Sequence, residues 1–358
     1  MTTLITGGAG FVGTNLADHL LRDGRRVRIL DDLSRPGVER NVDWLERTHG
    51  PHVEVMVGDV RDRATVRQAL RDVDSVFHFA AQVAVTTSLD EPLDDAGVNV
   101  TGTLHLLEEI RCAARPLPVI FTSTNKVYGS LPDVELLETE RHYVPVEPRM
   151  RDGVGESRAL SFCTPYGCSK GAADQYVLDW ARSFGVPSVV FRMSCIYGPH
   201  QQGNEDQGWV AHFMLSALEH EPITLFGDGK QVRDVLYVED LVRALLIAED
   251  RAAEFAGRAF NIGGGPGNAV SLLDVLEILA AVRGEAPQIR RRPWRTGDQR
   301  YYVSDTSAFS VATGWRPEVG VAEGVQRLHA WLLDDRQAAG SRYLEHTAHR
   351  PERVFHVV

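Results

Sequence analysis

A tyrosine and a lysine one helical turn apart are the first candidates for chemistry. They are Tyr166 and Lys170 in "TPYGCSK", and a spacing of four places both side chains on one face of a helix. An ammonium beside a phenol favours the phenolate, which can take a proton from an alcohol while the alcohol carbon gives up a hydride. The same spacing also arises by chance on helix surfaces, so this interpretation depends on the rest of the chain.

The second candidate is the polar end of an apolar segment. The run "PVIFTST" (118–124) contains β-branched and aromatic residues, which is typical of a buried strand. Thr124, Asn125 and Lys126 follow one another at its end. The Thr124 hydroxyl, 42 residues before Tyr166, could serve the same reaction. The alternative is a turn that only caps the strand, and it stays open for Lys126 in particular.

A glycine-rich turn predicts a dinucleotide site. The motif "ITGGAGFVG" follows the apolar segment 3–6, and it contains Gly8-x-Gly10-x-x-Gly13 and equally Gly7-x-x-Gly10-x-x-Gly13. Such glycines permit a tight turn and let a pyrophosphate approach the backbone. The helix expected after the turn offers free N–H groups and the positive end of its dipole.

An acidic residue indicates which dinucleotide is bound. Asp31 ends the next apolar segment, 18 residues past Gly13. A carboxylate there should bind the adenosine ribose hydroxyls and repel a 2′-phosphate, so NAD is favoured over NADP. Arg35 keeps NADP open, because an arginine at that point could meet a phosphate. The candidate NAD contacts in these and the following strand ends are Gly7, Gly10, Phe11, Val12, Gly13, Asp31, Asp59, Val60, Ala80, Ala81 and Gln82.

The elements that must hold these residues alternate through the first half of the chain. Short apolar segments are separated by amphipathic, helix-like segments, which predicts βαβ units and a parallel sheet covered on both faces. The expected fold class is therefore α/β, a Rossmann-type doubly wound sheet with a smaller α/β substrate-binding C-terminal domain. We expect an NAD-binding domain of residues 1–194 plus 235–262, a substrate-binding domain of 195–234 plus 263–333, and a tail of 334–358.

Composition narrows the class of protein. The 358 residues are 43% hydrophobic and 24% charged, as in ordinary globular proteins, and the net charge of −11 argues against nucleic acid as a partner. No run reaches the ~18 apolar residues of a membrane span, and "MTTLITGGAG" does not resemble a secretory signal. Cysteines without CxxC spacing or a histidine cluster predict reduced thiols, a cytoplasmic protein and no metal. They are Cys112, Cys163, Cys168 and Cys195.

Three motifs together carry a resemblance to a known family. "TGGAGFVG", "STNKVYG" and "YGCSK" resemble the extended short-chain dehydrogenase/reductase family, the NAD-dependent epimerases and dehydratases of nucleotide sugars, over residues 1–333. Within it, "YGCSKGAADQYVLD", "DQGWV" and "GKQVRDVLYVEDL" are most similar to the CDP-paratose/CDP-tyvelose 2-epimerases. The resemblance implies a catalytic triad of Thr124, Tyr166 and Lys170, a tightly bound NAD and a homodimer.

The Asn-Lys pair separates two reactions of that family. Its 4,6-dehydratases are implied to carry an acidic pair after the threonine, whereas Asn125 and Lys126 are poor acids near neutral pH. We therefore expect epimerisation at C2 through a keto sugar, with Tyr166 as base and Lys170 on the nicotinamide ribose, so that both also count as NAD contacts. The stretch "GVGESRALSF" (153–162) departs from those relatives and leaves C4 epimerisation of a UDP-hexose or UDP-uronic acid open, as well as a non-catalytic NAD sensor.

The substrate's diphosphate needs cations. The guanidinium fork suits it, so Arg233 in "KQVRDV" and Arg300 in "GDQR" are candidates, although each could instead pair with Asp234 or Asp298 at the surface. The basic run "RRRPWR" (290–295) is interpreted as a solvated strand. The expected substrate contacts are Thr124, Asn125, Lys126, Gln207, Trp209, Arg233 and Arg300.

Overall fold

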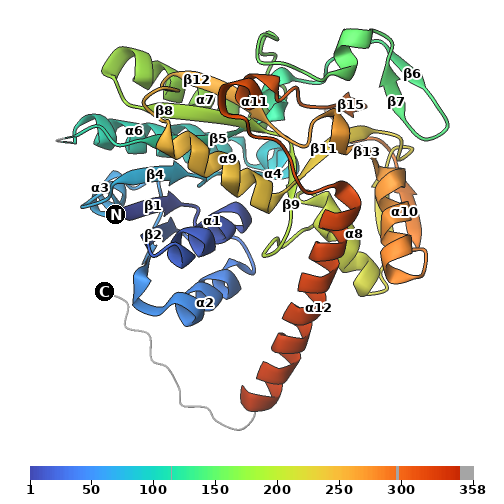
Figure 1. Ribbon diagram of the computed structural model, residues 1–358, viewed down its shortest axis with the longest axis horizontal. Coiled ribbons are helices and arrows are strands. Elements are labelled where there is room, and N and C mark those ends of the chain that lie inside the picture. Colours follow the sequence, from blue (N-terminus) through green and yellow to red (C-terminus); the bar gives the residue numbers. More distant parts are fainter. Residues whose placement is uncertain (114, 296–297, 347–358) are drawn as a thin grey trace.

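A seven-stranded parallel sheet forms the body of the protein (Figure 1). The computed structural model describes residues 1–113, 115–295 and 298–346. The strand order β12-β8-β5-β4-β1-β2-β3 reverses direction at β1, as in doubly wound sheets, and the predicted fold class is confirmed. The strands are β1 (Thr2–Thr6), β2 (Arg26–Asp31), β3 (Val53–Val57), β4 (Ser75–His78), β5 (Val119–Thr124), β8 (Ser188–Met193) and β12 (Arg258–Ile262).

Helices cover both faces of this sheet because its strands are apolar on both faces. Neighbouring residues of β1 point to opposite layers: Ile5 packs with Leu16 and Leu245, and Leu4 packs with Val66 and Leu106. In Figure 1, α1 and α9 lie in front of the sheet. The helices of the first layer are α1 (Phe11–Arg22), α2 (Val38–His49) and α9 (Val238–Asp250), and those of the second are α3 (Arg63–Ala69), α6 (Thr103–Arg111) and α7 (Thr164–Phe184).

The helical stretch that precedes β5 is interrupted in the structure. A π-helical segment, η2 (Gly97–Gly102), separates α5 (Pro92–Ala96) from α6. Gly102 lies so close to the loop after β3 that a Cβ on it would come within 2.6 Å of the Val60 side chain. The remaining short elements of this part are η1 (Gly50–His52), α4 (Val85–Asp90), η3 (Asn125–Tyr128), β6 (Leu136–Glu138), β7 (Tyr143–Pro145) and η4 (Pro148–Arg151).

A smaller α/β part lies over the carboxyl ends of the sheet. Its helices enclose a second apolar core that includes Phe213, Leu225 and Leu276. Its strands are β9 (Cys195–Tyr197), β10 (Ile223–Phe226), β11 (Val232–Tyr237), β13 (Ala269–Ser271), β14 (Ile289–Arg292) and β15 (Tyr301–Tyr302). Its helices are α8 (Trp209–Leu218), η5 (Pro266–Asn268), α10 (Leu272–Arg283) and α12 (Val321–His346), whereas α11 (Ser307–Thr313) packs against β12 of the large sheet.

The division into two domains stays a prediction, and two of its bounds fall inside elements. Strand β11 crosses the bound at 234. It is one continuous strand that pairs with β13 and β15 in its first half and with β9 in its second. Helix α12 crosses the bound at 333 and continues to His346. The rest of the expected tail, 347–358, lies outside the described residues.

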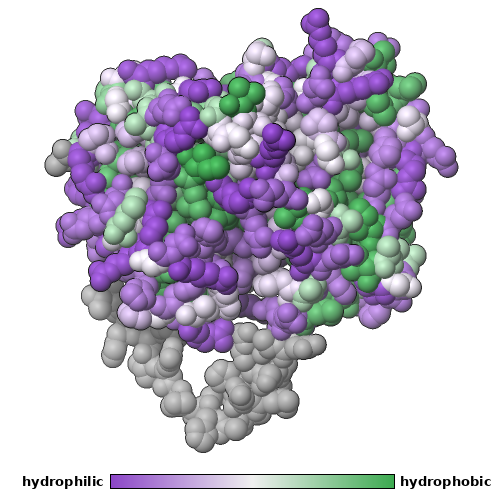
Figure 2. Space-filling view, in the orientation of Figure 1, coloured by the Kyte–Doolittle hydropathy of each residue, from purple (hydrophilic) through white to green (hydrophobic). Residues whose placement is uncertain are grey.

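The surface is mostly hydrophilic on the face in Figure 2, with hydrophobic patches between the polar side chains. None of the helices in the described ranges combines the length and apolar composition that crossing a membrane requires. The four cysteines are free thiols.

Candidate active site

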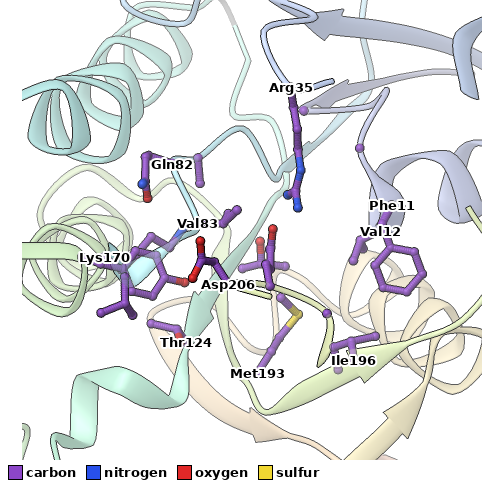
Figure 3. A pocket seen from close by; sticks show the side chains of 18 of the residues that line it. Phe11, Val12, Arg35, Gln82, Val83, Thr124, Lys170, Met193, Ile196 and Asp206 are labelled. Atoms are coloured by element: carbon purple, nitrogen blue, oxygen red, sulfur yellow. The ribbon is translucent and has the colours of Figure 1, made fainter. Parts of the chain in front are cut away.

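A cavity of about 940 Å³ opens at the carboxyl ends of the parallel strands. It lies at β1, where the strand order reverses, and this is the position at which doubly wound sheets bind ligands. In Figure 3, Lys170 and Thr124 lie together on one side of the cavity, Phe11 and Val12 lie on the other, and Arg35 reaches towards its centre. The cavity is thus lined by both sets of residues that the sequence singled out.

The glycine turn after β1 fits a dinucleotide pyrophosphate. Gly7 has a φ of 68°, and a Cβ on it would lie 2.6 Å from the Ala80 backbone nitrogen. A Cβ on Gly13 would lie 2.6 Å from the Gly7 carbonyl oxygen. Helix α1 begins at Phe11, directly after the turn, so its first N–H groups are available to an anion. Larger residues at Gly7 and Gly13 would therefore fill the space that the turn leaves for a pyrophosphate.

The adenosine end of the cavity holds the predicted carboxylates. The two Asp31 oxygens accept hydrogen bonds from the Ala9 and Leu33 backbone N–H groups, both at 3.0 Å, and burial raises the pKa of this carboxyl. Asp59 forms an ion pair with Arg61, which lowers the Asp59 pKa through a hydrogen bond. The other predicted NAD contacts also line the cavity: Gly10, Val12, Val60, Ala80, Ala81 and Gln82.

The three residues of the expected triad come together. Helix α7 begins at Thr164 and carries Tyr166 and Lys170 on successive turns, while Thr124 ends β5. Burial raises the pKa of the Tyr166 phenol to about 12, and the Thr124 side chain beside it acts to lower that pKa. Burial lowers the Lys170 pKa to about 7, and its Nζ lies 4.3 Å from the centroid of the Phe121 ring.

The structure separates the Asn-Lys pair. Lys126 lines the cavity, and its Nζ donates to Gln299 Oε1 at 3.3 Å. Its pKa is lowered first by burial and then by the nearby Arg233 guanidinium. The Asn125 side chain is buried outside the lining, where its Oδ1 accepts from the Thr124 hydroxyl at 3.4 Å. Lys126 can therefore reach a substrate directly, and Asn125 acts on the Thr124 hydroxyl.

The substrate end contains three of the remaining predicted contacts. Gln207, Trp209 and Arg233 line the cavity. The buried Arg233 guanidinium donates to Asp298 at 2.7 Å, which is one of the pairings considered from the sequence. Arg300 is not brought to the cavity: it is exposed, and its guanidinium lies 5.4 Å from the Tyr143 ring centroid.

Sequence reasoning missed an aromatic and basic group at this end. Trp294, Arg295 and Phe226 line the cavity, and the Arg295 guanidinium lies 3.7 Å from the centroid of the Phe226 ring. Arg295 also forms an ion pair with Asp206 at 3.3 Å. The interpretation of 290–295 as a solvated strand fits only the exposed β14 (Ile289–Arg292). A tryptophan and an arginine just beyond such a strand were the available signal.

Comparisons with known proteins agree with this geometry. The model of the "NAD dependent epimerase/dehydratase family" matches residues 3–263. The chain is 43% identical to the CDP-paratose 2-epimerase of Salmonella typhi, over 92% of this chain and 99% of that protein. It is 31% identical to a putative UDP-glucose 4-epimerase of Methanocaldococcus jannaschii, over 93% of this chain and 98% of that protein.

Solved structures of related enzymes share the whole fold. The UDP-glucose 4-epimerase of Thermotoga maritima with UDP-glucose has a TM-score of 0.79 at 29% identity, covering 94% of this chain and all (100%) of that one. The UDP-glucuronic acid 4-epimerase of Bacillus cereus, in complex with UDP-glucuronic acid and NAD, has a TM-score of 0.80 at 25% identity, covering 93% and 99%. The chain belongs to the NAD dependent epimerase/dehydratase family, and its cofactor is NAD.

Proposed function

We propose that this NAD-dependent nucleotide-sugar epimerase inverts C2 of a nucleoside diphosphate hexose of the CDP-paratose/CDP-tyvelose type. The observation that carries the proposal is the end of β5, where Thr124 and Lys126 face the cavity beside Tyr166 and neither position after Thr124 bears a carboxyl group. The 43% identity to a CDP-paratose 2-epimerase supports the choice of C2 and of a cytidine nucleotide.

Three side chains have separate roles in the proton transfer that accompanies oxidation and reduction of the sugar carbon. Tyr166 takes the proton of the sugar hydroxyl and later returns it to the same oxygen. NAD held at the glycine turn would supply the hydride acceptor for the sugar carbon and the donor that returns the hydride to the opposite face. Thr124 hydrogen-bonds the reacting oxygen, and its side chain beside the Tyr166 phenol acts to lower the pKa of that phenol. The Lys170 ammonium stabilises the phenolate from the same helix face and holds the nicotinamide ribose.

Lys126 occupies a position at which a dehydratase of this family is expected to carry an acidic residue. Loss of water from a sugar requires a group that protonates the leaving hydroxyl and a base that removes the neighbouring C–H proton. Burial lowers the Lys126 pKa and makes its ammonium a better proton donor, but Asn125 supplies no base beside it, so we assign Lys126 to holding a ketone oxygen. The keto sugar must also rotate inside the site before the hydride returns to its opposite face. The net reaction is redox-neutral, so the cofactor stays bound between turnovers.

The diphosphate occupies the end of the cavity that carries the arginines. Arg233 is buried there with its charge balanced by Asp298. A diphosphate carries more negative charge than one carboxylate, and it can accept hydrogen bonds from the Arg233 guanidinium together with Asp298. Arg295 lies close by on Phe226 and can turn towards the same anion.

The test is proton NMR of the purified protein, without added NAD, against CDP-, UDP- and GDP-hexoses that include CDP-paratose. Conversion of one sugar to its C2 diastereomer is expected, and Tyr166→Phe should lower that turnover at least 100-fold. A C4 diastereomer would move the proposal to a 4-epimerase, which the relatives of 31% identity support. A 4-keto-6-deoxy product would contradict the argument from Lys126.

A homodimer in the cytoplasm completes the proposal. Helices α4, α5 and α7 pack together, and their outer side exposes apolar side chains that a second copy could cover. Light scattering of the purified protein should give about twice the mass of one chain, and a monomer would refute the dimer. The free thiols support a cytoplasmic location, which cell fractionation tests. The exposed apolar residues on these helices that do not line the cavity are Leu93, Tyr176 and Phe184.

A further inference from the structure

A buried carboxyl group with one free oxygen lies behind the catalytic helix. Asp95 on α5 has no exposed surface. Its Oδ1 accepts a hydrogen bond from Asn99 Nδ2 at 3.2 Å, and its Oδ2 has no partner within the described part of the chain. An ionised carboxylate is costly to bury in this state unless a positive charge lies nearby. Asp95 does not line the cavity, so it does not meet the substrate.

A short hydrogen-bond network joins Asp95 to the catalytic pair. The amide of Asn99, in the π-helical segment η2, also donates to Ser169 Oγ at 2.9 Å, and that hydroxyl in turn donates to the Tyr166 carbonyl oxygen at 3.2 Å. Helices α5 and α7 pack directly against each other. Asp95 is therefore fixed against the turn of α7 that carries both Tyr166 and Lys170.

Lys170 is the matching buried cation. Its side chain is 3% exposed, and among the described residues its Nζ has the Phe121 ring as neighbour in place of a hydrogen-bond acceptor. Two carboxylates act on its charge, Asp174 on its own helix and Asp95. Asp174 already binds Arg192 through both oxygens, each at 2.9 Å. Of these two carboxylates, Asp95 is the one that is not paired with another cation among the described residues.

The other titratable groups around α7 do not replace it. From β4, His78 is neutral near pH 7, since burial lowers its pKa to about 3. From η3, the cation Lys126 adds no negative charge. Asp94, next to Asp95 on α5, is paired with Arg61.

We propose that Asp95 is a positioning residue whose carboxylate balances the Lys170 ammonium and so keeps the Tyr166–Lys170 pair in its working protonation state. The proposal rests on the proton-transfer role given to this pair in the proposed function. Without the Asp95 charge, the Lys170 ammonium and the Tyr166 phenol both lose a proton more easily, because no carboxylate then favours the ammonium or opposes the phenolate. The pair titrates as a unit, so both limbs of the pH–rate profile should move.

The experiment compares Asp95→Asn with the wild-type holoenzyme. The introduced side-chain amide can still accept the hydrogen bond from Asn99, so the variant removes charge and keeps shape. Both limbs of kcat/KM against pH are expected to move to lower pH by about one unit. Asp95→Glu should restore the wild-type profile, and Asp90→Asn, an exposed carboxyl at the end of α4, is the matched control. Retained NAD and the melting temperature establish that each variant is folded.

A second readout does not depend on any substrate. The tyrosinate absorbance of Tyr166 is obtained by subtracting the titration of Tyr166→Phe, in the wild-type and the Asp95→Asn background, and it should appear at lower pH without the carboxylate. If the absorbance moves while no nucleotide sugar is epimerised, the proposed function fails and this proposal stands. If both curves are unchanged, or activity falls at every pH without a shift, Asp95 has a structural role only and the proposal is overturned.

Discussion

The buried ion pair between Asp174 and Arg192 fixes the catalytic helix to the central sheet. Asp174 on α7 has no exposed surface and Arg192 on β8 is 5% exposed. Their two hydrogen bonds are both 2.9 Å long. Asp174 is one turn beyond Lys170 and two beyond Tyr166, so this pair sets how far α7 lies from the sheet and from Thr124 at the end of β5.

Replacing Asp174 by Asn should destabilise the protein by about 3–5 kcal/mol, because the Arg192 guanidinium is then buried without its counter-charge. The introduced amide oxygen can still accept one hydrogen bond from the guanidinium, and the bond to the Tyr128 hydroxyl at 3.2 Å also remains, but neither supplies a negative charge. That loss lowers the ratio of folded to unfolded protein roughly 100- to 5,000-fold. The double variant Asp174→Leu with Arg192→Met should regain most of the stability, since it removes both charges together.

Urea unfolding of the NAD-free proteins, followed by circular dichroism, measures these differences. Asp179→Asn, on the same helix but exposed, is the control and should change the free energy of unfolding by less than about 0.5 kcal/mol. A loss below about 1 kcal/mol for Asp174→Asn would refute the reasoning, because Arg192 would then have found water or another partner. A double variant as unstable as Asp174→Asn would show that packing, and not charge balance, decides the result.

Two further predictions concern the cofactor turn and the catalytic lysine. Gly13→Ala places a Cβ 2.6 Å from the Gly7 carbonyl oxygen, so NAD affinity measured by calorimetry should fall about tenfold or more, whereas Gly267→Ala, with open space around it, should leave NAD affinity unchanged. The Lys170 pKa is about 7 in the fold against 10.5 ordinarily, so the unfolded chain binds the extra proton between these values and stability rises with pH there. The advantage of the NAD-free wild type over Lys170→Met in urea unfolding should therefore grow by about 2 kcal/mol from about pH 7.5 to about pH 9, and no change would contradict this.

The parts of the fold and the site that follow from local patterns could be predicted from the sequence. The apolar strands, the glycine turn and the four-residue spacing of Tyr166 and Lys170 depend on residues close together in the chain. The sequence left the partner of Arg233 open between a diphosphate, Asp234 and Asp298, because the choice depends on how a loop 65 residues later packs against β11. Likewise Arg300 and Arg295 belong to one basic stretch, and only the packed structure decides that Arg295 enters the cavity.

The burial of the proton-transfer pair bears on the kind of reaction. A dehydrogenase that releases its oxidised product must also release a proton to water, so its base needs a route to solvent. An epimerase returns the proton to the oxygen it came from, and its base can be closed off. Tyr166 is 9% and Lys170 3% exposed, and the residues joined to them from behind, Asn99 and Asp95, are buried as well. A buried pair of this kind needs its charge balanced inside the protein, which is why an internal carboxylate such as Asp95 belongs to the same argument as the redox-neutral cycle.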